Sequence, residues 1–186
     1  MRINLPNGLT IARILMVPLM VIAFYLPFRG TNRIAAAMFT IAAITDWLDG
    51  YLARRYQQTS DFGAFLDPVA DKLAVTVALF LIVQADKTAL MAVTAAIIVG
   101  REITISALRE WMAEIGERTK VGVAWLGKVK TVVQMIAIII LLMQHRYVGK
   151  PLYWFGKALL IAAAALTIWS AVVYLRAAWP VIRSRA

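Results

Sequence analysis

Six long apolar runs dominate this chain and constrain its fold more than any other feature. They cover approximately residues 10–28, 33–54, 68–84, 88–111, 121–144 and 152–179. A helix needs about 20 apolar residues to cross a bilayer, and each run is close to that length. Hydrophobic residues make up 62% of the chain, whereas about 45–50% is typical of soluble domains. The sequence therefore predicts an all-α integral membrane protein with six transmembrane helices.

The connections between these runs are too short to hold a soluble domain, so we expect a single membrane domain over residues 1–186. Residues 1–9 precede the first run and alternate apolar and polar side chains. Such a segment can lie along the membrane surface. We expect it to form a short interfacial segment before the first span.

The net charge of +10 lies mainly at the ends of the apolar runs. Basic residues in this position fix membrane topology, so we expect no nucleic-acid partner. If the N-terminus is cytoplasmic, six spans place most of the 20 Lys and Arg residues on the cytoplasmic side, together with all acids except Asp86. The sequence thus predicts that both termini are cytoplasmic and that the polar chemistry gathers at that face. A cation transporter is the distant alternative, but its charged residues would more often lie near the midplane.

The second run ends in an acidic segment with small residues between its carboxylates. At 100° per residue, Asp46, Asp49, Gly50 and Ala53 share one face of a helix. Two carboxylates then lie one turn apart, beside positions with little or no side chain. Such a face can hold cations while a bulky ligand approaches the backbone.

The next helix carries a second acidic pair, Asp67 and Asp71, which are four residues apart and also share a face. Pro68 suits the first turn of that helix. Because the loop between the two helices is short, we expect them to be antiparallel neighbours whose acidic faces meet.

Four carboxylates at close range repel one another unless cations neutralise them. The chain has no cysteine, and no histidine lies near these residues, so every candidate ligand is an oxygen. Oxygen ligands suit Mg²⁺ or Mn²⁺, and two such ions can clamp a diphosphate. The alternative is a solvated acidic loop with helix caps, in which Asp67 caps the helix that follows.

The acidic segment resembles the motif of the CDP-alcohol phosphatidyltransferases. The spacing D-x-x-D-G-x-x-A-R-x(8)-G-x-x-x-D-x-x-x-D is matched without a gap by Asp46, Asp49, Gly50, Ala53, Arg54, Gly63, Asp67 and Asp71. The N-terminal run Pro6-Asn7-Gly8-Leu9-Thr10-Ile11-Ala12-Arg13 is also similar to the P-N-x-L-T-x-x-R run of this family. With the six spans, the resemblance covers nearly the whole chain.

The resemblance implies transfer of a phosphatidyl group from CDP-diacylglycerol to an alcohol, at the cytoplasmic face of a bacterial inner membrane, by a homodimer. It assigns Asp71 as the general base. The implied metal ligands, which would hold two Mg²⁺ or Mn²⁺ ions, are Asp46, Asp49, Asp67 and Asp71. The implied contacts with the CDP-lipid are Asn7, Thr10, Gly50, Ala53, Arg54 and Ser60.

The second half of the chain resembles the family members whose acceptor is sn-glycerol 3-phosphate. This likeness lies in Arg101-Glu102, in residues 106–111 and in residues 127–131. Basic residues near the cytoplasmic ends of the fourth and fifth runs suit the phosphate of such an acceptor. These candidates are Arg101, Arg109, Lys120, Lys128 and Lys130. Positive-inside topology explains some of them equally well, and serine or inositol phosphate stays open as another acceptor.

Overall fold

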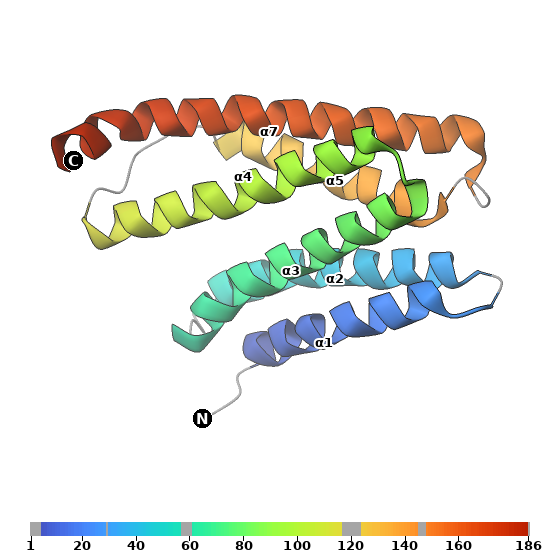
Figure 1. The fold of residues 1–186 in the computed structure, drawn as a ribbon. Helices are drawn as coiled ribbons and strands as arrows, with labels where there is room; N and C mark the ends of the chain where they lie inside the picture. The colour runs from blue at the N-terminus through green and yellow to red at the C-terminus, as the bar shows by residue number, and fades with distance from the viewer. Residues whose placement is uncertain (1–4, 29, 57–60, 117–123, 145–147, 186) are drawn as a thin grey trace. The chain divides into compact units, whose positions relative to one another are not determined.

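The computed structural model describes residues 5–28, 30–56, 61–116, 124–144 and 148–185. Within these ranges, the side chains of residues 5–7, 47, 49–56, 61–65, 67, 124–126, 128 and 184–185 are not described. The main helices are α1 (Leu5–Tyr25), α2 (Thr31–Tyr56), α3 (Asp61–Asp86), α4 (Ala89–Glu114), α5 (Ala124–Leu142) and α7 (Lys150–Arg185) (Figure 1). No residue in the described ranges forms a strand. The prediction of an all-α protein is confirmed.

Four of these helices are long and apolar enough to cross a membrane. Their apolar stretches are Gly8–Tyr25 in α1, Pro68–Asp86 in α3, Ala89–Glu114 in α4 and Lys150–Arg183 in α7. A shorter apolar stretch, Val129–Leu142, lies in α5. These stretches support a membrane protein, while the count of six spans and the cytoplasmic termini stay predictions.

Two helices begin well before the starts that the sequence predicted. α1 starts at Leu5, so residues 5–9 continue this helix, and residues 1–4 lie outside the described residues. α3 starts at Asp61, so the prediction that Pro68 lies in its first turn was wrong. Proline removes one backbone hydrogen bond from a helix interior, but membrane helices tolerate it because nearby groups can satisfy the freed carbonyl.

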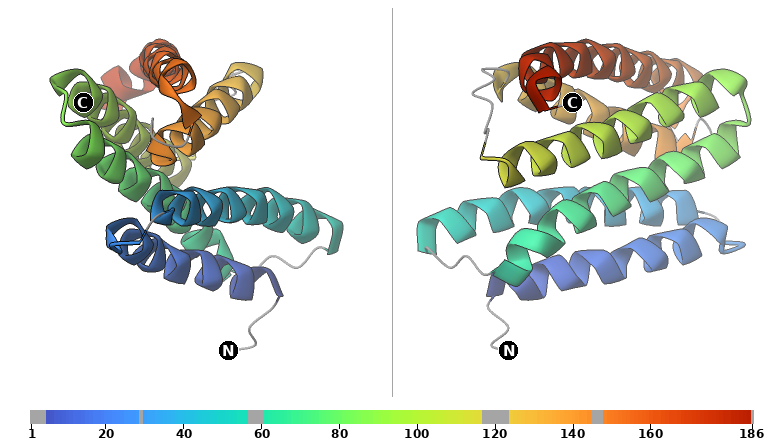
Figure 2. Two further views of the ribbon diagram at one scale, coloured as in Figure 1. Left: turned by 90° about the vertical axis from the view of Figure 1, so that its right-hand side faces the viewer. Right: turned by 60° about the vertical axis from the view of Figure 1, so that its left-hand side comes forward.

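The chain divides into two compact units. Unit 1 comprises Met1–Asp86 and Ile138–Tyr153, and unit 2 comprises Lys87–Ala137 and Trp154–Ala186. In unit 1, α1 packs against both α2 and α3, as the views in Figures 1 and 2 show. The single domain expected over residues 1–186 stays a prediction.

Small residues allow the helices of unit 1 to pack closely. The buried positions of α2 include Ala35, Ala36 and Ala42, and those of α3 include Ala70 and Ala78. Small side chains let helix backbones approach one another, which is how membrane helices gain packing contacts. This packing places the acidic ends of α2 and α3 within the same unit as α1.

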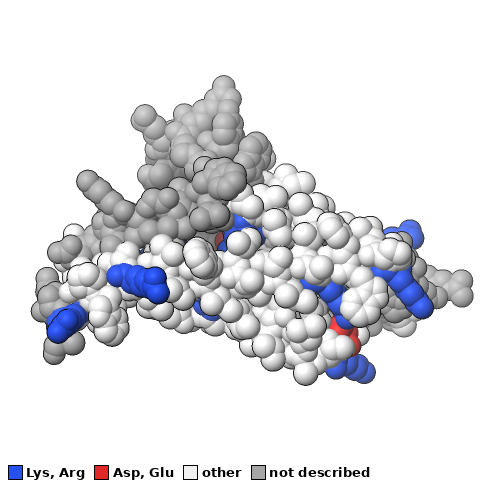
Figure 3. Space-filling view, turned by 90° about the horizontal axis from the view of Figure 1, so that it is seen from above, with Lys and Arg blue, Asp and Glu red and all other residues white. Residues whose placement is uncertain are grey.

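Unit 2 contains α4 together with most of α5 and α7. Thr88 caps the N-terminus of α4, where its hydroxyl accepts a hydrogen bond from the backbone N–H of Met91. The helix ends at Glu114, and Gly116, two residues later, has a φ of 77°, which is strained for other residues. On the face shown in Figure 3, most of the described surface carries no charged side chain, and Lys and Arg are confined to a few places.

Candidate active site

Asp46, the first aspartate of the acidic motif, lies on α2 and contacts an arginine from α1. Nη1 of Arg13 donates to Oδ1 of Asp46 at 2.6 Å. The Arg13 side chain is 2% exposed, whereas that of Asp46 is 42% exposed. The buried arginine therefore holds one oxygen of a carboxylate that remains accessible to ions or ligands.

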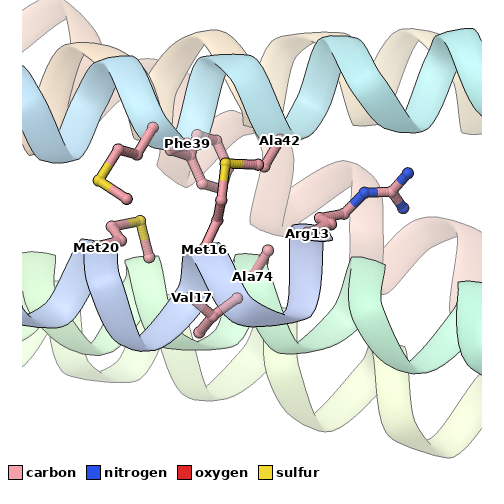
Figure 4. A pocket seen from close by; sticks show the side chains of 8 residues that line it. Arg13, Met16, Val17, Met20, Phe39, Ala42 and Ala74 are labelled. Atoms are coloured by element: carbon pink, nitrogen blue, oxygen red, sulfur yellow. The ribbon is translucent and has the colours of Figure 1, made fainter. Parts of the chain in front are cut away.

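Arg13 lies at one end of an apolar pocket inside unit 1. Met16, Met20 and Phe39 line this pocket, and in Figure 4 the guanidinium of Arg13 points away from the methionines. Thr10, one turn before Arg13, is also buried. A buried arginine requires a partner because an unpaired charge in a low-dielectric interior is strongly unfavourable. The contact with Asp46 helps to meet this requirement.

Asp71, the predicted general base, lies on α3 and is partly exposed between the buried residues Ala70 and Ala74. The rest of the motif follows the same two helices. Asp49, Gly50, Ala53 and Arg54 lie on α2, Asp67 lies on α3 and Asn7 lies on α1, but their side chains fall outside the described residues. Ser60 falls outside them entirely. The common cluster of four aspartates thus stays a prediction.

The donor set suits a hard divalent ion. Asp46 on α2 and Asp71 on α3 offer carboxylate oxygens, and both carboxylates keep some exposure. Among the side chains that the structure describes, no three His, Cys, Asp or Glu residues form a metal-binding group. This finding leaves the four-aspartate site untested because the side chains of Asp49 and Asp67 are not among them.

Unit 2 holds a second charged cluster, which surrounds Arg101 of α4. Nη2 of Arg101 donates to Oγ of Ser170 on α7 at 2.7 Å, and its Nη1 lies 3.8 Å from Oε1 of Glu102. Ser170 in turn donates to the backbone carbonyl of Thr167 at 3.0 Å. The hydroxyl is therefore oriented to accept the hydrogen bond from Arg101. A charged side chain inside an apolar helix commonly marks a functional site.

Lys130 and Arg109 also belong to this cluster, through contacts with Glu102 and Tyr174. Nζ of the buried Lys130 on α5 contacts Oε1 of Glu102 at 2.5 Å. Nη2 of Arg109 donates to the hydroxyl of Tyr174 on α7 at 2.5 Å. The structure thus brings Arg101 and Lys130 to the same glutamate, and it gives Arg109 a tyrosine partner. Lys120 and the side chain of Lys128 lie outside the described residues.

Sequence reasoning assigned no site role to four residues that these clusters contain, namely Arg13, Glu102, Ser170 and Tyr174. For Arg13 a signal was present. Thr10, Arg13, Val17 and Met20 recur at helical spacing and are all buried, so the arginine lies on the packed face of α1. Tyr174 and Ser170 are 65 or more residues from the arginines that they contact, and no local pattern could reveal such pairs.

The comparison with protein families agrees with this arrangement. A sequence model of the family described as CDP-alcohol phosphatidyltransferase matches residues 3–169. This match includes the acidic motif of α2 and α3 and reaches into α7. The chain belongs to the CDP-alcohol phosphatidyltransferase family.

Close relatives carry one common name, CDP-diacylglycerol–glycerol-3-phosphate 3-phosphatidyltransferase. The relative from Sodalis glossinidius is 50% identical over 178 residues, covering 96% of both chains. The relative from Pseudomonas fluorescens is 49% identical and covers 97% of this chain and 93% of its own length. The relative from Haemophilus influenzae is 51% identical, with 96% of this chain and 95% of the relative covered. The likeness therefore extends over nearly the full length.

Proposed function

We propose that the protein transfers the phosphatidyl group of CDP-diacylglycerol to sn-glycerol 3-phosphate. The products are phosphatidylglycerophosphate and CMP, as in a bacterial phosphatidylglycerophosphate synthase, which serves phosphatidylglycerol and cardiolipin synthesis. The observation that carries this proposal is the identity of about 50% over nearly the whole chain with relatives named for that reaction.

The acidic motif is proposed to bind two metal ions, either Mg²⁺ or Mn²⁺. Asp46, Asp49, Asp67 and Asp71 would supply the ligands, all of them carboxylate oxygens. Such ions, when bound, neutralise a diphosphate and stabilise the departing CMP. Arg13 supports this role because it fixes one oxygen of Asp46 by a hydrogen bond, and partners of this kind orient metal ligands.

In the proposed reaction, Asp71 acts on the acceptor hydroxyl. Asp71 takes the proton from the primary hydroxyl of glycerol 3-phosphate as general base. That oxygen forms a bond to the phosphorus next to diacylglycerol, and the bond from this phosphorus to the bridging oxygen of CMP breaks. Asn7, Thr10, Gly50, Ala53, Arg54 and Ser60 are proposed to bind the CDP-lipid. No covalent intermediate is needed, since the acceptor oxygen is itself the nucleophile.

The acceptor phosphate is assigned to the basic residues of the second half of the chain. Arg101 and Arg109 donate hydrogen bonds to neutral hydroxyl groups of α7, which do not neutralise their positive charges. Arginine binds phosphate well because its planar group can donate two parallel hydrogen bonds. Lys120, Lys128 and Lys130 are further candidates.

The proposed setting is the inner membrane of a bacterium, with the site open to the cytoplasm, where glycerol 3-phosphate is dissolved. Four apolar helices support the membrane location, and the basic residues at helix ends support the orientation. Homodimerisation is part of the proposal through the family resemblance.

The direct test is CMP release by the purified protein from CDP-diacylglycerol in detergent or lipid. We expect release to require glycerol 3-phosphate, to stop with a chelator and to return when Mg²⁺ or Mn²⁺ is restored. Serine and inositol phosphate serve as competing acceptors in parallel reactions. A protein that released CMP only with one of these would retain the family chemistry but lose the proposed acceptor.

A further inference from the structure

Tyr174 contacts two arginines that come from different turns of α4. The Cζ atom of Arg109 is 4.8 Å from the centre of the Tyr174 ring, and that of Arg101 is 5.9 Å from it. Cations within about 6 Å of an aromatic ring are attracted by its electron-rich face. The Tyr174 hydroxyl also accepts the hydrogen bond from Arg109. One side chain of α7 therefore contacts both guanidinium groups.

Arg101 is held from the same helix by Ser170, which lies one turn before Tyr174. The arginines are eight residues apart on α4, so their side chains leave the helix about 80° apart. Without partners on α7, two like charges would separate. Ser170 fixes one arginine and Tyr174 the other, so α7 determines how the pair is arranged.

The charges of this cluster do not balance. Arg101, Arg109 and Lys130 are three cations, and Glu102 is the sole carboxylate that contacts them among the described residues. Glu102 lies 2.5 Å from Lys130 and 3.8 Å from Arg101, so it mainly neutralises the lysine. Two positive charges remain, both on arginine. A phosphate monoester carries about −1.5 to −2 charges near neutral pH, which complements this excess.

Arg101 also has an unused donor. Its Nε is buried and has no hydrogen-bond partner within the part of the chain that the structure describes. A buried donor without a partner is unfavourable. An anion that approaches the guanidinium could accept from it.

We propose that Tyr174 is a positioning residue, which holds Arg101 and Arg109 as the anion-binding pair for the phosphate monoester of the acceptor. In this arrangement Glu102 neutralises Lys130 in an internal ion pair. The two arginines, rather than the lysine, therefore determine the affinity for phosphate. The identity of the acceptor as glycerol 3-phosphate rests on the proposed function, whereas the anion-binding pair does not.

The test compares Tyr174→Phe and Tyr174→Leu with the wild-type protein in steady-state CMP release. Tyr174→Phe keeps the ring but loses the hydroxyl, and we expect the KM for glycerol 3-phosphate to rise about fivefold. Tyr174→Leu loses both contacts, and we expect a rise of about 30-fold. The KM for CDP-diacylglycerol should stay within about twofold, since Tyr174 acts on the acceptor alone.

Tyr153→Phe is a matched control on the same helix. The Tyr153 hydroxyl donates to Oδ2 of Asp86 at 2.8 Å, so this variant also removes one tyrosine hydrogen bond from α7. It should leave both KM values unchanged. An increase equal to that of Tyr174→Phe would mean that any loss of a hydroxyl on α7 disturbs the site, which would overturn the proposed role.

Binding of radiolabelled inorganic phosphate provides a readout that does not depend on turnover. The dissociation constant should rise in parallel with the acceptor KM, in the order wild type, Tyr174→Phe, Tyr174→Leu. Equal phosphate affinity in all three proteins would overturn the inference. A wild-type protein that bound phosphate but released no CMP with glycerol 3-phosphate would contradict the proposed function alone. If Tyr174→Leu fails to fold, Tyr174→Phe decides the outcome.

Discussion

The two charged clusters of this protein differ in the sign of their main charge. In unit 1, an acidic motif on α2 and α3 is accompanied by the buried Arg13, which contacts Asp46. In unit 2, a basic cluster on α4 and α5 is accompanied by Glu102, which contacts Lys130. Each cluster therefore contains an internal counter-charge that leaves part of the majority charge available for a ligand. If the four aspartates lie together as proposed, the excess in unit 1 is negative and suits divalent ions, whereas the excess in unit 2 is positive and suits phosphate.

This difference fits the proposed reaction, which uses two anionic substrates. A diphosphate approaches carboxylates only if metal ions reverse their charge, whereas a phosphate monoester binds arginines directly. Removal of metal should thus affect the first cluster, and changes in the arginines should affect the second.

The largest effect is expected at Asp71. Asp71→Asn keeps the size of the side chain but cannot accept a proton, so CMP release should fall about 10²–10⁴-fold. Expression and thermal stability should change little, because the residue is partly exposed on α3. Initial rates at saturating concentrations of both substrates measure the effect. A variant with near-normal turnover would remove Asp71 from the role of general base.

The counter-charge of unit 1 should contribute strongly to stability. Arg13→Ala deletes a buried side chain and its bond to Asp46, and we expect it to lower the free energy of unfolding by about 3 kcal/mol. Thermal melting in detergent measures the loss. Arg183→Ala is the control, because Arg183 is exposed near the end of α7 and its loss should be nearly neutral. Equal melting temperatures for the two variants would mean that Arg13 is not a buried counter-charge.

The counter-charge of unit 2 should show coupling between its two partners. Glu102→Gln leaves the buried ammonium of Lys130 without its carboxylate, and we expect a loss of about 2 kcal/mol. Adding Lys130→Met removes the unpaired charge and should recover at least half of that loss. Thermal melting of the single and double variants forms a double-mutant cycle. Simple additivity of the two single effects would contradict the ion pair.

A small effect is expected where a hydrogen bond belongs to neither cluster. Tyr153→Phe removes the bond to Asp86, and we expect a loss of stability of about 1 kcal/mol with unchanged kinetics. The same melting and CMP-release assays measure both quantities. A change in the metal requirement or in the acceptor KM would show that the loss of this hydrogen bond affects the two clusters.

The helical fold could be predicted from the sequence, whereas the contacts that build each cluster could not, and the reasons are physical. Apolar length predicts helices because a bilayer requires about 20 residues, and α1, α3, α4 and α7 agree with this. The acidic motif was recognisable because its aspartates repeat at helical spacing over a short segment. The contacts of Arg13 and Tyr174 could not be predicted because their partners lie 33 and 65 residues away in the sequence. Only folding brings such residues together. Pro68 was misplaced because proline usually marks a helix start, although α3 continues through it.

The most direct test of the division between the clusters is the pair of KM values for Arg109→Ala. Arg109 is exposed on α4, and Tyr174 is its hydrogen-bond partner within the part of the chain that the structure describes, so its removal should not disturb the fold. We expect the KM for glycerol 3-phosphate to rise about 10–100-fold, as the loss of a charge-assisted hydrogen bond implies, while the KM for CDP-diacylglycerol and the Mg²⁺ requirement stay unchanged. A rise confined to CDP-diacylglycerol, or no change in either value, would contradict the assignment of donor and acceptor to the two clusters.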